Sequence, residues 1–171
     1  MLEHRNFVKK LVFPVETLPV NLVISGLVSE IFGVALFLAG SYLARGYIPA
    51  SIVWLPVLVI PQILLTAGLC WFLAALGVFV RDLAHVNGFL LTLWFFLTPI
   101  CYPESSLPAP AMQILSKNPM FVLVRGYRAA LLEGHAPDLH SLWKCCAVSG
   151  PLFGLGHAWF YKLRESFVER V

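Results

Sequence analysis

The chain alternates between long apolar stretches and short polar segments. The apolar stretches lie at residues 18–40, 51–80, 84–100 and 141–161. A helix needs about 20 apolar residues, within a range of about 17–25, to cross the hydrocarbon core of a bilayer. The stretches lack the polar–apolar alternation of strands in a membrane barrel. The pattern therefore predicts an all-α integral membrane protein with about four transmembrane helices, forming a single transmembrane domain over residues 1–171.

The stretch at residues 51–80 is longer than a perpendicular helix needs to cross the bilayer. It contains Pro56 and Pro61. Proline removes a backbone donor and clashes with the preceding turn, so it breaks or kinks a helix. We therefore expect the membrane-crossing helix to begin near Pro61, with residues 52–60 lying at the interface.

The external loop at residues 101–140 predicts two short helices. Asn118 followed by Pro119 is a helix-start signal, and Gly134 is a stop signal. These two signals bound one helix, Pro119–Glu133, and a shorter helix is expected before it, near residues 111–116. Both helices are too short for a crossing, and irregular backbone at membrane depth is tolerated only where protein or a water-filled cavity covers it. We expect a re-entrant or interfacial pair on the outer side, where a transport path would open.

The distribution of Lys and Arg favours a cytoplasmic location for both termini, because the predicted inner segments carry seven of these residues and the outer segments five. The amphipathic segment at residues 1–17 is either a basic collar at the lipid headgroups or a cytoplasmic coupling segment for a partner protein. The turn at Arg81 and Asp82 is either a solvated loop or a helix start capped by the Asp82 side chain.

Composition argues against a soluble domain and gives no indication of a nucleic-acid partner or a metal site. Hydrophobic residues make up 59% of the 171 residues and charged residues 12%, whereas soluble domains carry roughly 25% charged residues. The net charge of +3 comes without a free-standing basic run, so nothing indicates a nucleic-acid partner. The four cysteines lie in or at the end of apolar runs and lack metal-ligand spacing. We expect a membrane protein with no metal site and no cofactor.

Recognisable catalytic motifs are also absent, including metal-binding HExxH, a phosphate-binding Walker loop and a nucleophile elbow. Glu30 is the one acid inside an apolar stretch. Acids in membrane helices are costly and tend to be functional, so Glu30 either makes a helix–helix hydrogen bond or lines a hydrated path. Gly150 and Gly154 form a small-xxx-small pattern, followed by Gly156, and this pattern permits close helix packing.

Aromatic residues cluster in the third apolar stretch, at Phe89, Trp94, Phe95 and Phe96. Rings of this kind can stack on sugars, but contact with lipid or packing against neighbouring helices is the favoured interpretation.

Four motifs carry a resemblance to a known family. They are NFVKKLVFPVETLP at residues 6–19, FVRDLAHV at 79–86, FFLTPICYPESSLP at 95–108 and NPMFVLVRGYRAALLEG at 118–134. In content, order and spacing the chain resembles the permease subunit of ABC-2 type exporters, in the branch that moves O-antigen, teichoic acid and related glycans. Family members carry two further spans before the first motif. The chain therefore resembles the C-terminal two-thirds of a permease and looks truncated at its N-terminus.

The resemblance implies a role for each segment. Residues that would couple the chain to a separate ABC ATP-binding subunit are Lys9, Lys10, Phe13, Pro14, Glu16, Arg81 and Asp82. Residues expected to line the translocation path are Glu30, Phe89, Trp94, Phe95, Tyr102, Arg125 and Arg128. A second permease copy and a lipid-linked polysaccharide would complete the set of partners, in the bacterial inner membrane. ATP would be hydrolysed in the partner, and this chain would not be an enzyme.

Other functions stay open at the level of sequence. An ABC-2 efflux permease for a drug, a lipid or another small cargo would share the fold. A membrane-embedded transferase is less favoured, because it should show paired carboxylates or metal ligands at a membrane face. A non-functional fragment or a structural anchor is the remaining alternative.

Overall fold

A computed structural model describes residues 17–80, 82–100 and 102–170, and every regular element within these ranges is helical. In chain order the elements are α2 (Thr17–Arg45), η1 (Ala50–Trp54), α3 (Leu55–Phe79), α4 (Leu83–Leu97), η2 (Glu104–Ser106), α5 (Ala109–Leu115), α6 (Pro119–Arg128), η3 (Ala129–Glu133) and α7 (Leu139–Arg170). The all-helical prediction is confirmed for these residues.

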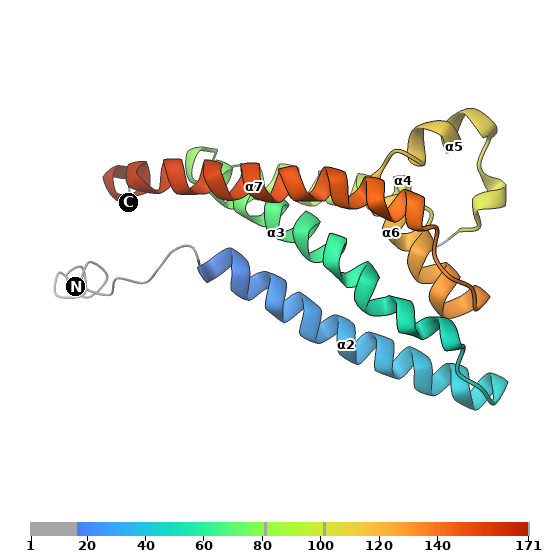
Figure 1. Ribbon diagram of the computed structural model, residues 1–171. Helices are drawn as coiled ribbons and strands as arrows, with labels where there is room; N and C mark the ends of the chain where they lie inside the picture. Colours follow the sequence, from blue (N-terminus) through green and yellow to red (C-terminus); the bar gives the residue numbers. More distant parts are fainter. Residues whose placement is uncertain (1–16, 81, 101, 171) are drawn as a thin grey trace.

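Two helical stretches among the described residues are long and apolar enough to cross a membrane: Pro19–Arg45 and Ala50–Gly77. The apolar helix His85–Leu97 is shorter. In Figure 1, α2, α3 and α7 run along the length of the molecule, and the start of α2 lies toward the same end as the end of α7. The short helices α5 and α6 lie toward the opposite end.

Helix α3 does not begin where the sequence predicted. It starts at Leu55, holds Pro56 in its first turn and continues through Pro61. Proline is tolerated in the first turn because the backbone N–H there has no acceptor within the helix. Pro61 costs one backbone hydrogen bond, but its ring is fully buried against neighbouring residues. The helix itself therefore begins before Pro61, and the expected start of the membrane crossing near Pro61 stays a prediction.

Helices α3 and α7 form the centre of the fold. Ala67, Trp71 and Ala75 of α3 pack in one buried cluster with Phe160 of α7. At the crossing, a Cβ added to Gly156 would lie 2.4 Å from the carbonyl oxygen of Gly68. The two main chains therefore touch directly, which only glycine allows.

The predicted outer helices are present, with small differences. Asn118 accepts a hydrogen bond from the Met120 backbone N–H at 3.1 Å, and Gly134 ends the helix with a positive φ of 75°. These contacts confirm the predicted start and stop signals. The last turn, η3, is a π-helix, and α5 begins at Ala109 rather than near residue 111.

At the start of α4, the structure does not show the side-chain cap that was one of the two alternatives for Asp82. Its side chain makes no capping hydrogen bond; instead, its backbone carbonyl accepts from the N–H groups of His85 and Val86. The backbone of Asp82 has φ −87° and ψ 2°, not the extended conformation that lets a capping side chain reach back to the helix. The side-chain cap is therefore wrong.

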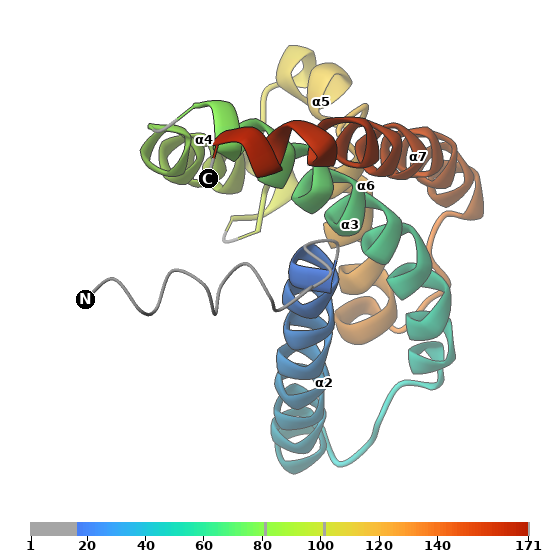
Figure 2. The ribbon, with the colours of Figure 1, turned by 90° about the vertical axis from the view of Figure 1, so that its left-hand side faces the viewer.

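Helix α2 packs loosely against the rest of the fold. It lies beside α3 in both ribbon views, and Figure 2 shows it apart from α4 and α5. The most apolar 18-residue stretch of this helix has no buried residue. Exposed apolar side chains on its surface include Leu22, Ile31, Phe32, Leu36 and Leu43. An apolar surface of this size needs lipid or another protein helix as its neighbour.

Candidate functional site

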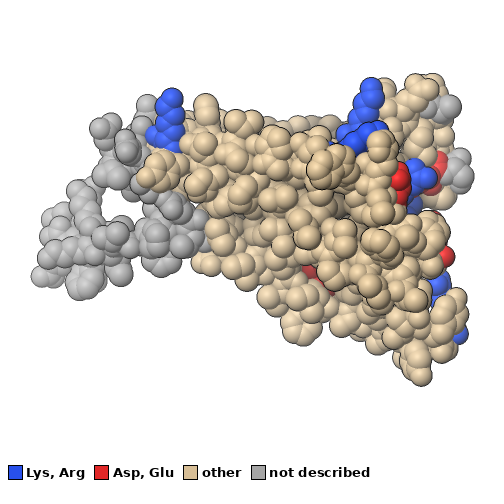
Figure 3. Space-filling view, in the orientation of Figure 1, with Lys and Arg blue, Asp and Glu red and all other residues tan. Residues whose placement is uncertain are grey.

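A polar cavity of about 600 Å³ lies among η2, α6, η3 and the start of α7. Ionisable side chains on its lining are Glu104, Arg125, Arg128, Glu133, His135 and Asp138. On the face drawn in Figure 3, basic and acidic side chains lie side by side at this end of the molecule. The cavity therefore offers hydrogen-bond donors and acceptors together.

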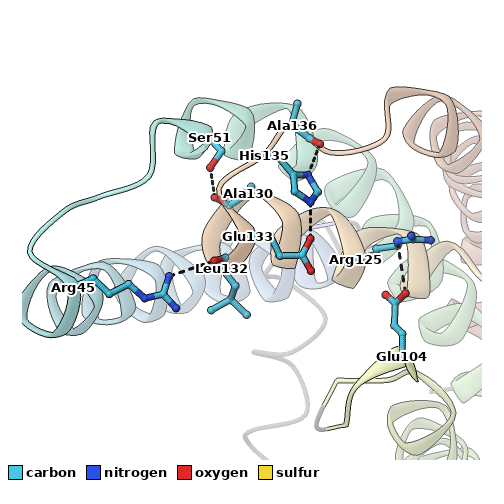
Figure 4. Close-up of polar contacts among 9 residues, drawn as sticks. All are labelled: Arg45, Ser51, Glu104, Arg125, Ala130, Leu132, Glu133, His135 and Ala136. Carbon is cyan, nitrogen blue, oxygen red and sulfur yellow. Dashed lines mark hydrogen bonds and ion pairs between the residues drawn. The ribbon is translucent and has the colours of Figure 1, made fainter. Parts of the chain in front are cut away.

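The two arginines of α6 have different surroundings. Arg128 donates to the backbone carbonyls of Ile100 at 2.9 Å and Tyr102 at 3.2 Å, so it holds the segment that follows α4. The Nε atom of Arg125 lies 3.7 Å from a carboxylate oxygen of Glu104, and its side chain is 63% exposed (Figure 4). Arg125 is therefore the guanidinium that an incoming molecule could reach.

His135 bridges two acceptors at the rim of the cavity. Its Nδ1 lies 3.0 Å from the carbonyl oxygen of Ala136, and its Nε2 lies 2.6 Å from a carboxylate oxygen of Glu133 (Figure 4). The Ala136 carbonyl, and after it the Glu133 carboxylate, raises the pKa of His135 above its usual value. Both ring nitrogens face acceptors, an arrangement that only the charged imidazolium satisfies.

Asp138 begins α7. Its carboxylate accepts from the Ser141 hydroxyl at 2.5 Å and from the His140 backbone N–H at 3.1 Å. The bond from the Ser141 hydroxyl is the main reason that the pKa of Asp138 is lowered. The carboxylate therefore stays charged at the helix N-terminus, where negative charge is favoured.

The π-helical turn η3 is tied to η1 and to the end of α2. Ser51 of η1 donates to the Ala130 carbonyl at 2.6 Å, and Arg45 at the end of α2 donates to the Leu132 carbonyl at 3.3 Å (Figure 4). A π-helical turn changes the register of its carbonyls, and such turns recur at functional sites. Here the turn joins the end of α2 and the helix η1 to the cavity.

A second polar cluster lies inside the helical body. Gln62 of α3 donates through Nε2 to Glu30 Oε2 of α2 at 2.6 Å. The Tyr127 phenol oxygen of α6 lies 2.7 Å from Glu30 Oε1 and 2.6 Å from Gln62 Oε1. Cavities of about 520 Å³ and 320 Å³ flank the cluster, and Glu30 and Gln62 line both of them. The helix–helix hydrogen bond considered for Glu30 is present, beside cavities that could hold water.

Comparison with known proteins identifies the family. Residues 1–132 match the family described as ABC-2 type transporter. The chain belongs to this family. Membership makes it a membrane protein and a transporter subunit, in agreement with the resemblance read from the four motifs.

Curated relatives of this ABC-2 family chain are named O-antigen export system permease protein RfbA. The protein from Myxococcus xanthus is 35% identical over 172 residues, covering 99% of this chain and 66% of the relative. Two proteins from Klebsiella pneumoniae are 28% and 24% identical, each over 78% of this chain and 52% of the relative. The chain thus spans between about half and two thirds of the length of the relatives it matches.

The structure distributes the predicted path residues of this ABC-2 chain over three places. Arg125 and Arg128 line the polar cavity of about 600 Å³, and Glu30 lies in the cluster with Gln62 and Tyr127. The four predicted aromatic residues line none of the three cavities. Exposed fractions are 71% for Phe89 and 44% for Phe95, and the Trp94 indole N–H donates to Asn118 while the Tyr102 hydroxyl donates to the Phe96 carbonyl.

Among the predicted coupling residues, only Asp82 lies within the described part of the chain. Asp82 lies exposed before α4, whereas Lys9, Lys10, Phe13, Pro14, Glu16 and Arg81 lie outside the described residues.

Sequence reasoning missed several polar residues of both sites. Gln62 could have been noticed as an isolated polar residue in a long apolar stretch, and Asp138 as a capping residue before an apolar run. Tyr127, Glu133 and His135 carried no comparable local signal.

Proposed function

We propose that the chain is the membrane-spanning permease subunit of an ATP-driven exporter of lipid-linked polysaccharide in the bacterial inner membrane. The observation that carries this proposal is the 35% identity, over 99% of the chain, to a protein named as an O-antigen export permease. In this proposal about four helices cross the membrane, both termini are cytoplasmic, and α5 and α6 are the re-entrant pair at the outer mouth.

The outer cavity supports a hydroxyl-rich cargo. A sugar hydroxyl both donates and accepts hydrogen bonds, so it is matched by carboxylates and guanidinium groups lying together. Glu104, Glu133 and Asp138 supply acceptors, and Arg125 supplies donors. A purely hydrophobic drug would gain little from such a lining.

Within the path, Arg125 has the most direct role, and Arg128 positions the segment that follows α4. Glu30, Phe89, Trp94, Phe95 and Tyr102 complete the proposed path, which two copies of the chain would enclose between them.

Energy would come from a separate ATP-binding subunit facing Lys9, Lys10, Phe13, Pro14, Glu16, Arg81 and Asp82. ATP binding shifts the permease between two conformations only if the partner contacts them differently. The cytoplasmic segments are where such a difference would be sensed.

Co-expression with the ATP-binding subunit of the same gene cluster tests the proposal. The wild-type pair should co-purify and place polysaccharide on the cell surface. Reversing two charges at once, with Lys9→Glu and Lys10→Glu, should lower co-purification about tenfold or more, since like-charge contacts cost several kcal/mol. Arg125→Ala should lower export while leaving the complex intact.

Lys117→Glu is the matched control, because it reverses a Lys charge in the turn between α5 and α6, away from the proposed coupling segment. Unchanged complex formation in the double variant would refute the coupling role. Transport of a small apolar molecule, with no change in surface polysaccharide, would refute the proposed cargo.

A further inference from the structure

Glu30, Gln62 and Tyr127 form a closed ring of short polar contacts, which we call the α2–α3–α6 ring. Each member touches the other two, at 2.6 Å, 2.6 Å and 2.7 Å. The residues are partly buried and come from three different helices, 32 and 97 positions apart from Glu30 in sequence. Contacts this short are normal for hydrogen bonds, but each needs a proton between its two heavy atoms.

Counting protons decides the charge of Glu30. Tyr127 has one hydroxyl proton, and Gln62 faces one contact with its NH₂ group and the other with its carbonyl oxygen. These groups supply protons for two of the three contacts. With an ionised carboxylate, the third contact would join two acceptors without a proton. We propose that Glu30 is a proton-binding site, held as a neutral carboxylic acid by the α2–α3–α6 ring.

In the neutral ring every donor has an acceptor. Gln62 Nε2–H donates to Glu30 Oε2, Glu30 Oε1–H donates to the Tyr127 phenol oxygen, and Tyr127 O–H donates to Gln62 Oε1. Exchanging the amide nitrogen and oxygen of Gln62 reverses the direction around the ring but still requires a proton on Glu30. The conclusion is therefore independent of how the amide is oriented.

The surroundings favour the neutral form as well. The titratable groups that face Glu30 from the other helices are Tyr127 of α6 and Cys70 of α3. No Lys, Arg or His occurs among the described residues that line either flanking cavity. Arg125 and Arg128 of α6 are directed instead to Glu104 and to the carbonyls of Ile100 and Tyr102. Within the part of the chain that the structure describes, no cation is therefore placed to compensate a carboxylate in this weakly polar site.

Proton loss would open the ring. When Glu30 releases its proton to water in a flanking cavity, two acceptors are left facing each other at about the distance of a hydrogen bond, and they repel. Helix α2 is otherwise largely exposed, so this ring and the bond from Arg45 to Leu132 are its principal polar attachments among the described residues. Protonation of Glu30 would thus fix α2 against α3 and α6. This inference does not depend on which cargo the chain transports.

Infrared spectroscopy of the purified chain in lipid nanodiscs tests the proposal directly. A protonated carboxyl has a carbonyl stretching band that a carboxylate lacks, and the band shifts in D₂O. At pH 7 the wild type should show such a band, Glu30→Gln should lose it, and raising the pH should abolish it in the wild type. A wild-type spectrum without a protonated carboxyl band at pH 7 would overturn the proposal, and this result needs no variant.

Two matched variants assign the band and the role of the ring. Glu133→Gln removes an exposed acid and should leave the band unchanged. Tyr127→Phe removes a ring member and should shift the band, whereas Tyr102→Phe removes a phenol outside the ring and should not. A band that survives in Glu30→Gln, or that responds equally to both tyrosine variants, contradicts the assignment.

Thermal unfolding gives a second readout. Glutamine at position 30 can replace the carboxyl O–H with an amide N–H, so Glu30→Gln should keep the ring and unfold near the wild-type temperature at acidic pH. The wild type should become less stable as the pH rises, because its folded state binds one more proton than its unfolded state. Glu30→Gln should show a smaller dependence, because it loses the contribution of Glu30 and keeps that of His135, whose pKa is also raised. If Glu30→Gln instead loses stability at every pH, in the same way as Tyr127→Phe, the neutral ring is refuted.

Discussion

His135 illustrates how local contacts fix the charge of a single residue. Its two ring nitrogens face the Ala136 carbonyl and the Glu133 carboxylate, and these contacts raise its pKa. The charged form is therefore favoured in the folded chain. The contact contributes most at acidic pH and is lost as the pH rises through the pKa of the folded state.

We predict that Glu133→Gln lowers the pKa of His135 without returning it fully to its ordinary value, because the Ala136 carbonyl remains. The ring-proton NMR signals of His135, followed through a pH titration, measure this change. Glu104→Gln is the control, since Glu104 lines the same cavity but pairs with Arg125. A midpoint for His135 that is the same in wild type and Glu133→Gln would contradict the contact.

Among the elements, the crossing of α3 and α7 is the most demanding contact. A Cβ at Gly68 would lie 2.8 Å from backbone atoms of Leu152 and Phe153, and a Cβ at Gly156 would meet the backbone of Gly68. Backbone atoms cannot rotate away, so a methyl group at either position must push the helices apart.

We predict that Gly156→Ala and Gly68→Ala each destabilise the fold by about 1–3 kcal/mol, the usual cost of overpacking. Gly150→Ala and Gly154→Ala are matched controls in α7, because a Cβ at either position has nothing within 4 Å. These controls should be neutral or slightly stabilising, since alanine favours helix over glycine by about 1 kcal/mol. Thermal unfolding in detergent compares the four variants, and equal losses in all of them would contradict the crossing.

Helices α6 and α7 show what sequence patterns can and cannot predict. Asn118 and Gly134 bounded the outer helix correctly, because capping depends on neighbouring backbone groups. The pattern at Gly150 and Gly154 marked α7 as a packing helix, but the contact itself uses Gly156 and a glycine on α3. Which helix lies opposite is a tertiary property that local spacing does not contain.

The candidate sites follow this rule too. Glu30 stood out in the sequence because an acid is rare in an apolar stretch, but its partners Gln62 and Tyr127 come from distant segments. The aromatic residues of α4 were grouped by sequence proximity, and the structure separates them from the described cavities.

Across the whole molecule, helix α6, which lines the polar cavity of about 600 Å³, and the end of α7 lie toward opposite ends of the long helices (Figure 1). In the proposed orientation, one end faces the cytoplasm and the other the outer side of the membrane. The exposed residues Ser106 of η2 and Lys162 of α7 report on these two ends.

We predict that Ser106→Cys reacts with a membrane-impermeant thiol reagent applied to the outer side of the inner membrane, whereas Lys162→Cys reacts only after the membrane is permeabilised. Both variants require replacement of the four native cysteines. Mass tagging of the labelled chain measures the reaction. The reverse pattern would show that the chain is inserted the other way round.

The glycine contacts also determine which substitutions a second change elsewhere could rescue. A Cβ at Gly126 would lie 2.5 Å from a methyl group of Leu58, which is the end of a side chain. A smaller residue at position 58 could make room for it, so these two positions can change together over evolutionary time. Gly68 and Gly156 meet main chain, which no substitution at a partner position can shorten. A second substitution can therefore offset a larger residue at Gly126, where α6 meets α3. No second substitution can offset a larger residue at Gly68 or Gly156, where α3 meets α7, so each of these two glycines must be retained.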